Sequence, residues 1–96
     1  MKFKLPKSIN ILGIKIKVKV VDSVEFMGLW DYSANTILLS SHQTKDQMEE
    51  SFWHEIRHCI QYLTALNQAM PRELLEVDAE MQSRIMPKLV RKVYGK

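Results

Sequence analysis

The sequence contains few of the residues that cross-link or break a chain. Among its 96 residues are one cysteine, three glycines and three prolines. The single cysteine, Cys59, excludes an internal disulfide and is typical of a reducing cytoplasm. No apolar run approaches the ~20 residues of a membrane span, and no long apolar segment follows the basic N-terminal residues as in a signal peptide. These absences lead us to expect a cytoplasmic protein without membrane contact.

Composition and charge indicate one globular domain. The chain is 46% hydrophobic and 26% charged, with a net charge of +3, which is ordinary for a globular protein. A chain of this length can bury one modest core, so we expect a single domain over residues 1–96. Lysines alternate along residues 15–19 without interleaved aromatic residues, and this does not favour a nucleic-acid partner.

The first half of the chain predicts strands. Residues 14–20 alternate strictly between β-branched residues and lysines, which indicates a strand with one buried face. Residues 29–32 and 36–40 predict two more strands, joined by a hairpin in which Asn35 adopts positive φ. We expect an antiparallel sheet of about three strands, with the exposed lysines protecting an edge from aggregation.

The second half predicts two helices, so the expected fold class is α+β. Thr44 and Gln47 form a potential capping box, and nothing interrupts a helix from there to about Leu66. Pro71 suits the first turn of a second helix, which Pro87 should end or kink. The predicted inner face of the second helix comprises Leu74, Leu75, Asp78, Met81, Gln82, Ile85 and Leu89.

The first helix carries the motif His54-Glu55-Ile56-Arg57-His58, which is H-E-x-x-H. On a helix the two histidines lie one turn apart and point the same way, so they can bind one metal ion. Glu55 lies about 100° further round the helix and can act on a water without being a ligand. This pattern indicates a zinc site with Glu55 as general base. The alternative is a solvated helix face that happens to carry these residues.

A hydrolytic zinc site needs a third protein ligand, and the second helix offers the acidic candidates. Asp78 lies in the middle of the predicted apolar face, where an unpaired carboxylate would be costly to bury. We therefore predict Asp78 as the third ligand, or as a hydrogen-bond partner of a ligating histidine. Pairing with Arg57 or Arg84 is an alternative role. Glu76 is the alternative ligand, although it clusters with Glu73 and Glu80 on the face opposite the apolar stripe.

Other side chains near the motif have more ordinary roles in this interpretation. Tyr62, one turn beyond His58, is a candidate contact for a substrate or for an oxyanion, with packing as the alternative. We expect His42 at the surface. Trp30 and Tyr32 are predicted to be core residues, and Cys59 a small core residue rather than a nucleophile.

Three segments together make the chain similar to a known family. They are residues 9–18, residues 28–40 leading into the H-E-x-x-H helix, and Val77-Asp78-Ala79. In this order they resemble the small phage and prophage zinc metallopeptidases related to the ImmA/IrrE-type minigluzincins. The resemblance covers most of the chain; the H-E-x-x-H motif is specific for zincins in general, and the other segments are weak alone.

The resemblance implies a minimal zincin: a small sheet on the active-site helix, a second helix with an acidic third ligand, and Zn²⁺ as cofactor. It implies hydrolysis of a peptide or protein substrate bound beside an edge strand, for which we expect residues 36–40. The chain departs from the family at the third ligand. Alignment on Val77-Asp78-Ala79 favours Asp78, whereas alignment on Met86-Pro87 favours Glu76. The alternative function is a non-catalytic, zincin-derived module that binds proteins in phage or host regulation.

Overall fold

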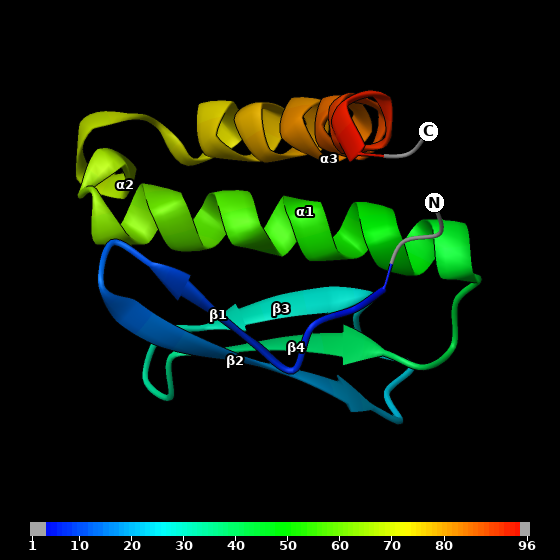
Figure 1. The fold of residues 1–96 in the computed structure, drawn as a ribbon. Coiled ribbons are helices and arrows are strands. Elements are labelled where there is room, and N and C mark those ends of the chain that lie inside the picture. The colour runs from blue at the N-terminus through cyan, green and yellow to red at the C-terminus, as the bar shows by residue number, and fades with distance from the viewer. Residues whose placement is uncertain (1–3, 95–96) are drawn as a thin grey trace.

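The computed structural model describes residues 4–94, and among these all side chains except those of residues 66–67 and 88–94. Four strands precede three helices: β1 Ser8–Ile11, β2 Ile14–Val21, β3 Gly28–Asp31, β4 Thr36–Ser40, α1 Lys45–Leu63, α2 Leu66–Ala69 and α3 Arg72–Tyr94. Figure 1 shows α1 lying across one face of the sheet, with α3 on the far side of α1. The predicted α+β class is confirmed. No helix in residues 4–94 is long and apolar enough to cross a membrane.

The sheet has four strands in the order β1-β2-β4-β3, and it is mixed. β4 runs parallel to β2, whereas the other two neighbouring pairs are antiparallel. The prediction of about three antiparallel strands was therefore wrong in number and in direction. β1 was missed because it is short and pairs locally with β2 across a turn at Leu12 and Gly13, both with positive φ.

The central position of β4 explains the parallel pair. The β3–β4 hairpin could dock on β2 through either strand, and β4 is the strand with residues suited to burial on both faces. Thr36, Ile37, Leu39 and Ser40 are all buried, whereas β3 leaves Leu29 exposed. β4 consequently pairs with β2, and β3 becomes an edge. The hairpin itself is as predicted, with Asn35 at φ 48°.

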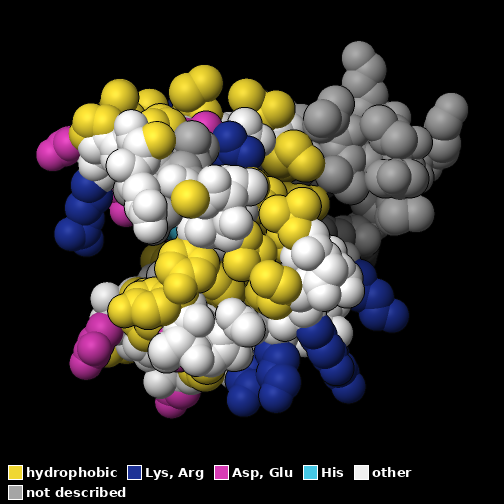
Figure 2. Space-filling model, turned by 90° about the vertical axis from the view of Figure 1, so that its left-hand side faces the viewer, with side chains coloured by type: hydrophobic (Ala, Val, Ile, Leu, Met, Phe, Trp, Pro, Cys, Tyr) yellow, Lys and Arg dark blue, Asp and Glu magenta, His cyan; other side chains and the backbone are white. Residues whose placement is uncertain are grey.

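The alternation of β2 is also confirmed, but its place in the sheet is not. Ile16 and Val18 are buried, and the alternating Lys15, Lys17 and Lys19 are exposed. β2 lies inside the sheet between β1 and β4, so its lysines do not protect an edge. They lie on the outer face instead, and dark-blue side chains are seen along the lower, sheet side of the molecule in Figure 2.

α1 begins as predicted and supplies half of the core. Thr44 is the N-cap: its hydroxyl accepts from Gln47 N at 3.2 Å, and Gln47 Oε1 accepts from Thr44 N at 2.9 Å. The helix ends at Leu63, earlier than the expected Leu66, because Ala65 takes a left-handed φ of 59°. The core packs the sheet against one face of α1 through Ile16, Val18, Ile37, Leu39, Phe52, Ile56 and Cys59.

α3 begins at Arg72, directly after Pro71, and its helical backbone continues through Pro87 to Tyr94. Pro87 therefore does not end it. The predicted inner face was wrong in part, since Leu74, Met81 and Ile85 are each about half exposed, whereas Leu75, Asp78 and Gln82 are half-buried. The buried residues of α3 include Ala79 and Ser83, which are small enough to let α3 lie close to α1. The side chain of Leu89 lies outside the described residues.

Candidate metal centre

Three side chains from two helices converge on one point. His54 and His58 extend from the same face of α1, and Glu76 reaches them from α3. The Nε2 atoms of the two histidines are 3.1 Å apart, and Glu76 Oε1 lies 3.3 Å from His54 Nε2 and 3.0 Å from His58 Nε2. Among the described residues, this is the one group of three or more potential ligands that could hold a metal ion.

The size of this triangle fits a tetrahedral zinc ion. Ligand atoms about 2.05 Å from zinc at the corners of a tetrahedron lie about 3.3 Å from one another. The three observed separations of 3.0 to 3.3 Å are close to that value. Two imidazoles and one carboxylate leave a fourth corner open, which is the arrangement of catalytic rather than structural zinc sites. The residues present therefore fit the ion that the motif implies.

Hydrogen bonds on the far side of each imidazole set its tautomer. His58 Nδ1 lies 2.8 Å from Gln61 Oε1, and His54 Nδ1 lies 3.2 Å from Glu80 Oε1. Both partners are acceptors, so each Nδ1 carries the proton and each Nε2 presents a lone pair. Two lone pairs and a carboxylate oxygen then face one another across about 3 Å. Such a cluster of acceptors is stable only with a cation or added protons among them.

Gln61 is central to this arrangement and is only 1% exposed. Its amide Nε2 donates to Leu75 O at 3.0 Å and to Asp78 Oδ2 at 2.8 Å, which leaves Oε1 to accept from His58. The same Asp78 oxygen accepts from Arg57 Nε at 2.6 Å. Hydrogen bonds thus run from His58 through Gln61 to Asp78 and Arg57, and they tie the histidine to α3.

Asp78, the predicted third ligand, is not in the converging group. Its carboxylate is held by Arg57 and Gln61, and the hydrogen bond from Arg57 is the main cause that lowers its pKa. Glu76, the alternative, is the acidic member of the converging group. Burial tends to raise the pKa of Glu76, but the charge and hydrogen bonds that His58 and His54 offer when their rings are protonated lower it overall. The pairing of Asp78 with Arg57 was one of the alternatives raised by the sequence.

Glu55 lies beside the triangle and is buried, with 7% of its surface exposed. Burial raises the pKa of its carboxyl, while His54, His58 and a hydrogen bond from the Trp30 backbone act in the opposite direction. A carboxylate with a raised pKa is better suited to accept a proton near neutral pH. Gly28 provides the space, because a Cβ at this position would lie 2.9 Å from Glu55 Cγ.

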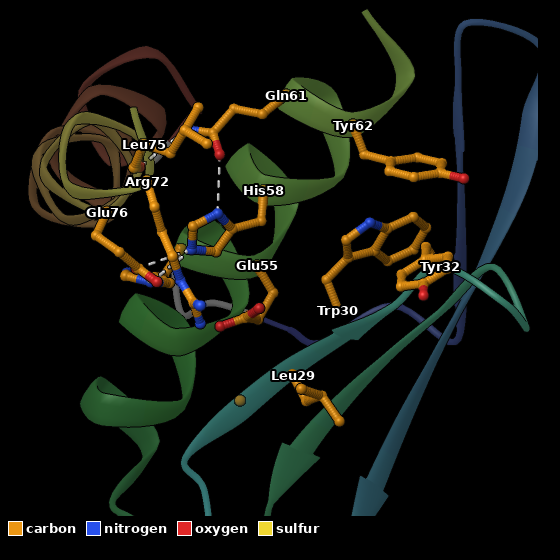
Figure 3. Close-up of a pocket in the computed structure, with 12 residues that line it drawn as sticks. Leu29, Trp30, Tyr32, Glu55, His58, Gln61, Tyr62, Arg72, Leu75 and Glu76 are labelled. Atoms are coloured by element: carbon orange, nitrogen blue, oxygen red, sulfur yellow. Dashed lines mark hydrogen bonds and ion pairs between the residues drawn. The ribbon is translucent and has the colours of Figure 1, made fainter. Parts of the chain in front are cut away.

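These residues line one cavity of about 810 Å³. Figure 3 shows His58 and Glu55 in its middle, with Trp30, Tyr32 and Tyr62 on one side. Tyr62 lines this cavity and packs against Trp30 and Tyr32, and its contact with a substrate or an oxyanion stays a prediction. Tyr32 was expected in the core but is 61% exposed and lines this cavity. Trp30 lines the cavity and also packs against the core, as expected. The hairpin turn after β3 brings Tyr32 against Tyr62, with ring centroids 5.4 Å apart.

The remaining candidates lie away from the ligand group. His42 is exposed and bonds to Asp22, so it is a surface residue as predicted. Glu73 is exposed, and Glu80 contacts His54 Nδ1 rather than the Nε2 atoms. Cys59 is fully buried on the core side of α1, and burial raises the pKa of its thiol to about 11.

The sequence did not indicate Gln61 or Arg72 as parts of the site, and it placed Glu80 among the acidic candidates for the third ligand and not as a hydrogen-bond partner of His54. Gln61 had a usable signal, since it follows His58 by three residues and therefore lies on the same side of the helix. The positions of Glu80 and Arg72 depend on how α3 is rotated about its axis, which no local pattern specified.

Comparison of the chain with family models, with curated proteins and with solved structures finds no match.

Proposed function

We propose that this chain is a zinc-dependent metallopeptidase of minimal zincin type. The observation that carries the proposal is the triangle of His54 Nε2, His58 Nε2 and Glu76 Oε1, with Glu55 buried beside it in an open cavity. Three ligands with a general base alongside are the components of a hydrolytic zinc site. Both histidine tautomers are set for metal binding by partners on their far sides.

The residues of this chain have distinct roles in such a reaction. Zinc, when bound, would polarise the scissile carbonyl and lower the pKa of a water to about 7. Glu55 accepts the proton of the attacking water and then donates it to the leaving amine. The Trp30 backbone N–H holds the Glu55 carboxylate in place. Gln61 and Glu80 keep the two imidazoles oriented throughout.

A peptide substrate would approach along β3. Residues 36–40, the strand expected to receive it, form β4, which lies between β2 and β3 and has no free edge. That expectation is corrected to β3, an edge strand whose Gly28, Leu29 and Trp30 line the cavity. An extended peptide paired with β3 by strand addition would pass directly in front of Glu55.

Metal analysis and a cleavage assay test the proposal. Purified protein should hold near-stoichiometric zinc, and mass spectrometry should find cleavage products from a broad peptide library. A chelator should stop cleavage by the wild type. Glu55→Gln should bind zinc as the wild type does and cleave nothing. Lys17→Gln, on the outer face of the sheet, serves as the control for a surface change.

Folded protein that takes up no zinc would refute the metal site. Full zinc binding without any cleavage would instead favour the alternative, a zincin-derived module that acts by binding proteins. The two measurements therefore separate the metal site from the peptidase activity.

A further inference from the structure

The cavity has two sides of different chemistry. On one side Trp30, Tyr32 and Tyr62 form an aromatic cluster contributed by β3, by the turn after it and by α1. Tyr32 and Tyr62 are stacked at 24° between ring planes, and Trp30 meets Tyr62 edge-on with ring centroids 6.1 Å apart. Figure 2, which looks onto this end of the molecule, shows hydrophobic side chains gathered between the helices and the sheet.

These aromatic rings are packed but not covered. Tyr32 is 61% exposed and Tyr62 is 42% exposed, so each presents a face or an edge to the cavity. When a further aromatic ring packs edge-to-face or offset against such a cluster, the contact stabilises the complex modestly beyond the effect of the buried area alone. A large apolar or aromatic side chain of a peptide would complete the cluster beside His58 and Glu55.

On the other side of these two residues lies Arg72, the first residue of α3 (Figure 3). Its side chain lies beside Glu76 and lines the cavity, yet it makes no hydrogen bond or ion pair with any residue in the part of the chain described. The charged lining residues besides the histidines are Arg72, Glu55 and Glu76. A bound zinc ion would balance the two carboxylates, which leaves the charge of Arg72 uncompensated.

We propose that the cavity selects peptides by two points at once: a large apolar or aromatic side chain on the Trp30, Tyr32 and Tyr62 cluster, and a carboxylate on Arg72. The scissile bond lies between these points, opposite Glu55. The guanidinium binds either an acidic side chain or the carboxylate of a free C-terminus, because both offer it the same carboxylate group. This selection rests on the proposed peptidase function, but it can be measured by binding alone.

The experiment uses a library of short synthetic peptides in two forms, one with free C-terminal acids and one amidated. Cleavage sites of the zinc-loaded wild type are identified by mass spectrometry. Peptides retained by zinc-loaded Glu55→Gln are identified in parallel. We expect aromatic or large apolar residues on one side of the cleaved bond, with a carboxylate on the other. If the carboxylate preference appears only with the free C-terminal acids, the ligand of Arg72 is the terminal carboxylate. If it appears with the amidated peptides as well, the ligand is an acidic side chain.

Matched variants separate the two points. Arg72→Gln should reduce the preference for carboxylates by about tenfold and leave the aromatic preference unchanged. Tyr32→Ser and Tyr62→Ser should each reduce the aromatic preference by about fivefold or more and leave the preference for carboxylates unchanged. Lys17→Gln and Val24→Ser remove a charge and an exposed apolar side chain that do not line the cavity, and neither should shift either preference.

Equal slowing of all peptides by Arg72→Gln would overturn the carboxylate site, because that result assigns the guanidinium a role independent of substrate charge. An aromatic preference that survives both tyrosine variants would overturn the aromatic site. If no peptide is cleaved, the peptides retained by Glu55→Gln decide the question. Enrichment of peptides that carry both an aromatic or large apolar residue and a carboxylate supports the proposed selection and refutes the peptidase activity. Retention of peptides without these two features refutes the proposed selection.

Discussion

Replacing Gln61 with leucine should weaken zinc binding although Gln61 touches no metal. The leucine is of similar size, and it removes the acceptor for His58 Nδ1 together with the donors to Leu75 O and Asp78 Oδ2. Loss of such a partner of a ligating histidine typically reduces metal affinity about 10- to 100-fold, which is about 1.4 to 2.7 kcal/mol of binding free energy. The imidazole then turns freely, and either nitrogen can carry its proton.

Gln61→Leu should also lower the stability of the metal-free protein. The part-buried Nδ1–H of His58 loses its acceptor, while Leu75 O keeps its place in the helical hydrogen bonding of α3 and Asp78 keeps its bond to Arg57. One buried group left without a partner costs about 1 to 3 kcal/mol. Zinc affinity is therefore measured by competition with a chromophoric chelator, under conditions in which circular dichroism shows each variant to be fully folded.

Two further variants make the experiment decisive. Gln43→Leu removes a glutamine whose Nε2 donates to Met27 O and Ser40 O and whose Oε1 accepts from Ser51 Oγ, before the start of α1. It should lose stability with no change in zinc affinity. Gln61→Glu retains an acceptor for His58 but places a second carboxylate beside Asp78, so it should restore zinc binding and remain less stable. Wild-type zinc affinity in Gln61→Leu, within about twofold, would refute the positioning role.

Four other experiments test the site and the fold. Glu76→Ala should abolish zinc binding, whereas Asp78→Ala should retain most of it in equilibrium dialysis, and the reverse order would return the ligand role to Asp78. Gly28→Ala places a Cβ 2.9 Å from Glu55 Cγ; it should slow peptide cleavage at least about tenfold, and unchanged turnover would contradict the close approach. Thr44→Ala should lower the free energy of unfolding in urea by about 1 kcal/mol, and no loss would argue against the capping box. The folded state holds the Cys59 thiol proton to about pH 11, whereas the unfolded chain releases it near pH 8.5. Stability should therefore be unaffected below about pH 8 and should fall above it by up to about 1.4 kcal/mol per pH unit, in wild type but not in Cys59→Ala.

Much of the local structure could be predicted because it depends on residues close in sequence. The capping box at Thr44, the left-handed Asn35 and the alternation of β2 each follow from the chemistry of a few neighbouring residues. The order of the strands could not be predicted in this way. Whether β3 or β4 pairs with β2 depends on how well each strand tolerates burial on both faces, and that is decided by the whole sheet and α1 together.

The same division separates the parts of the candidate metal centre. His54, Glu55 and His58 lie on one helix, so the helical period alone determines their relative positions, independently of the rest of the chain. The acidic member of the candidate group, Glu76, comes from a different helix, and its position depends on the rotation of α3 about its own axis. The helical wheel assumed that the apolar stripe of α3 faces inward, as it does on helices that cover a core.

That assumption fails because α3 belongs to a third layer. It packs mainly against the side of α1 that faces away from the sheet, and this side of α1 carries His54, Arg57, His58 and Gln61 rather than apolar residues. The interface between the two helices is consequently polar, with the small Ala79 and Ser83 allowing close approach. Leu74, Val77, Met81 and Ile85 remain about half exposed on the outside. The rotation of α3 is fixed by the residues of α3 that hydrogen-bond to the polar side chains of α1, and not by the apolar residues of α3. This rotation brings Glu76 to the two histidines.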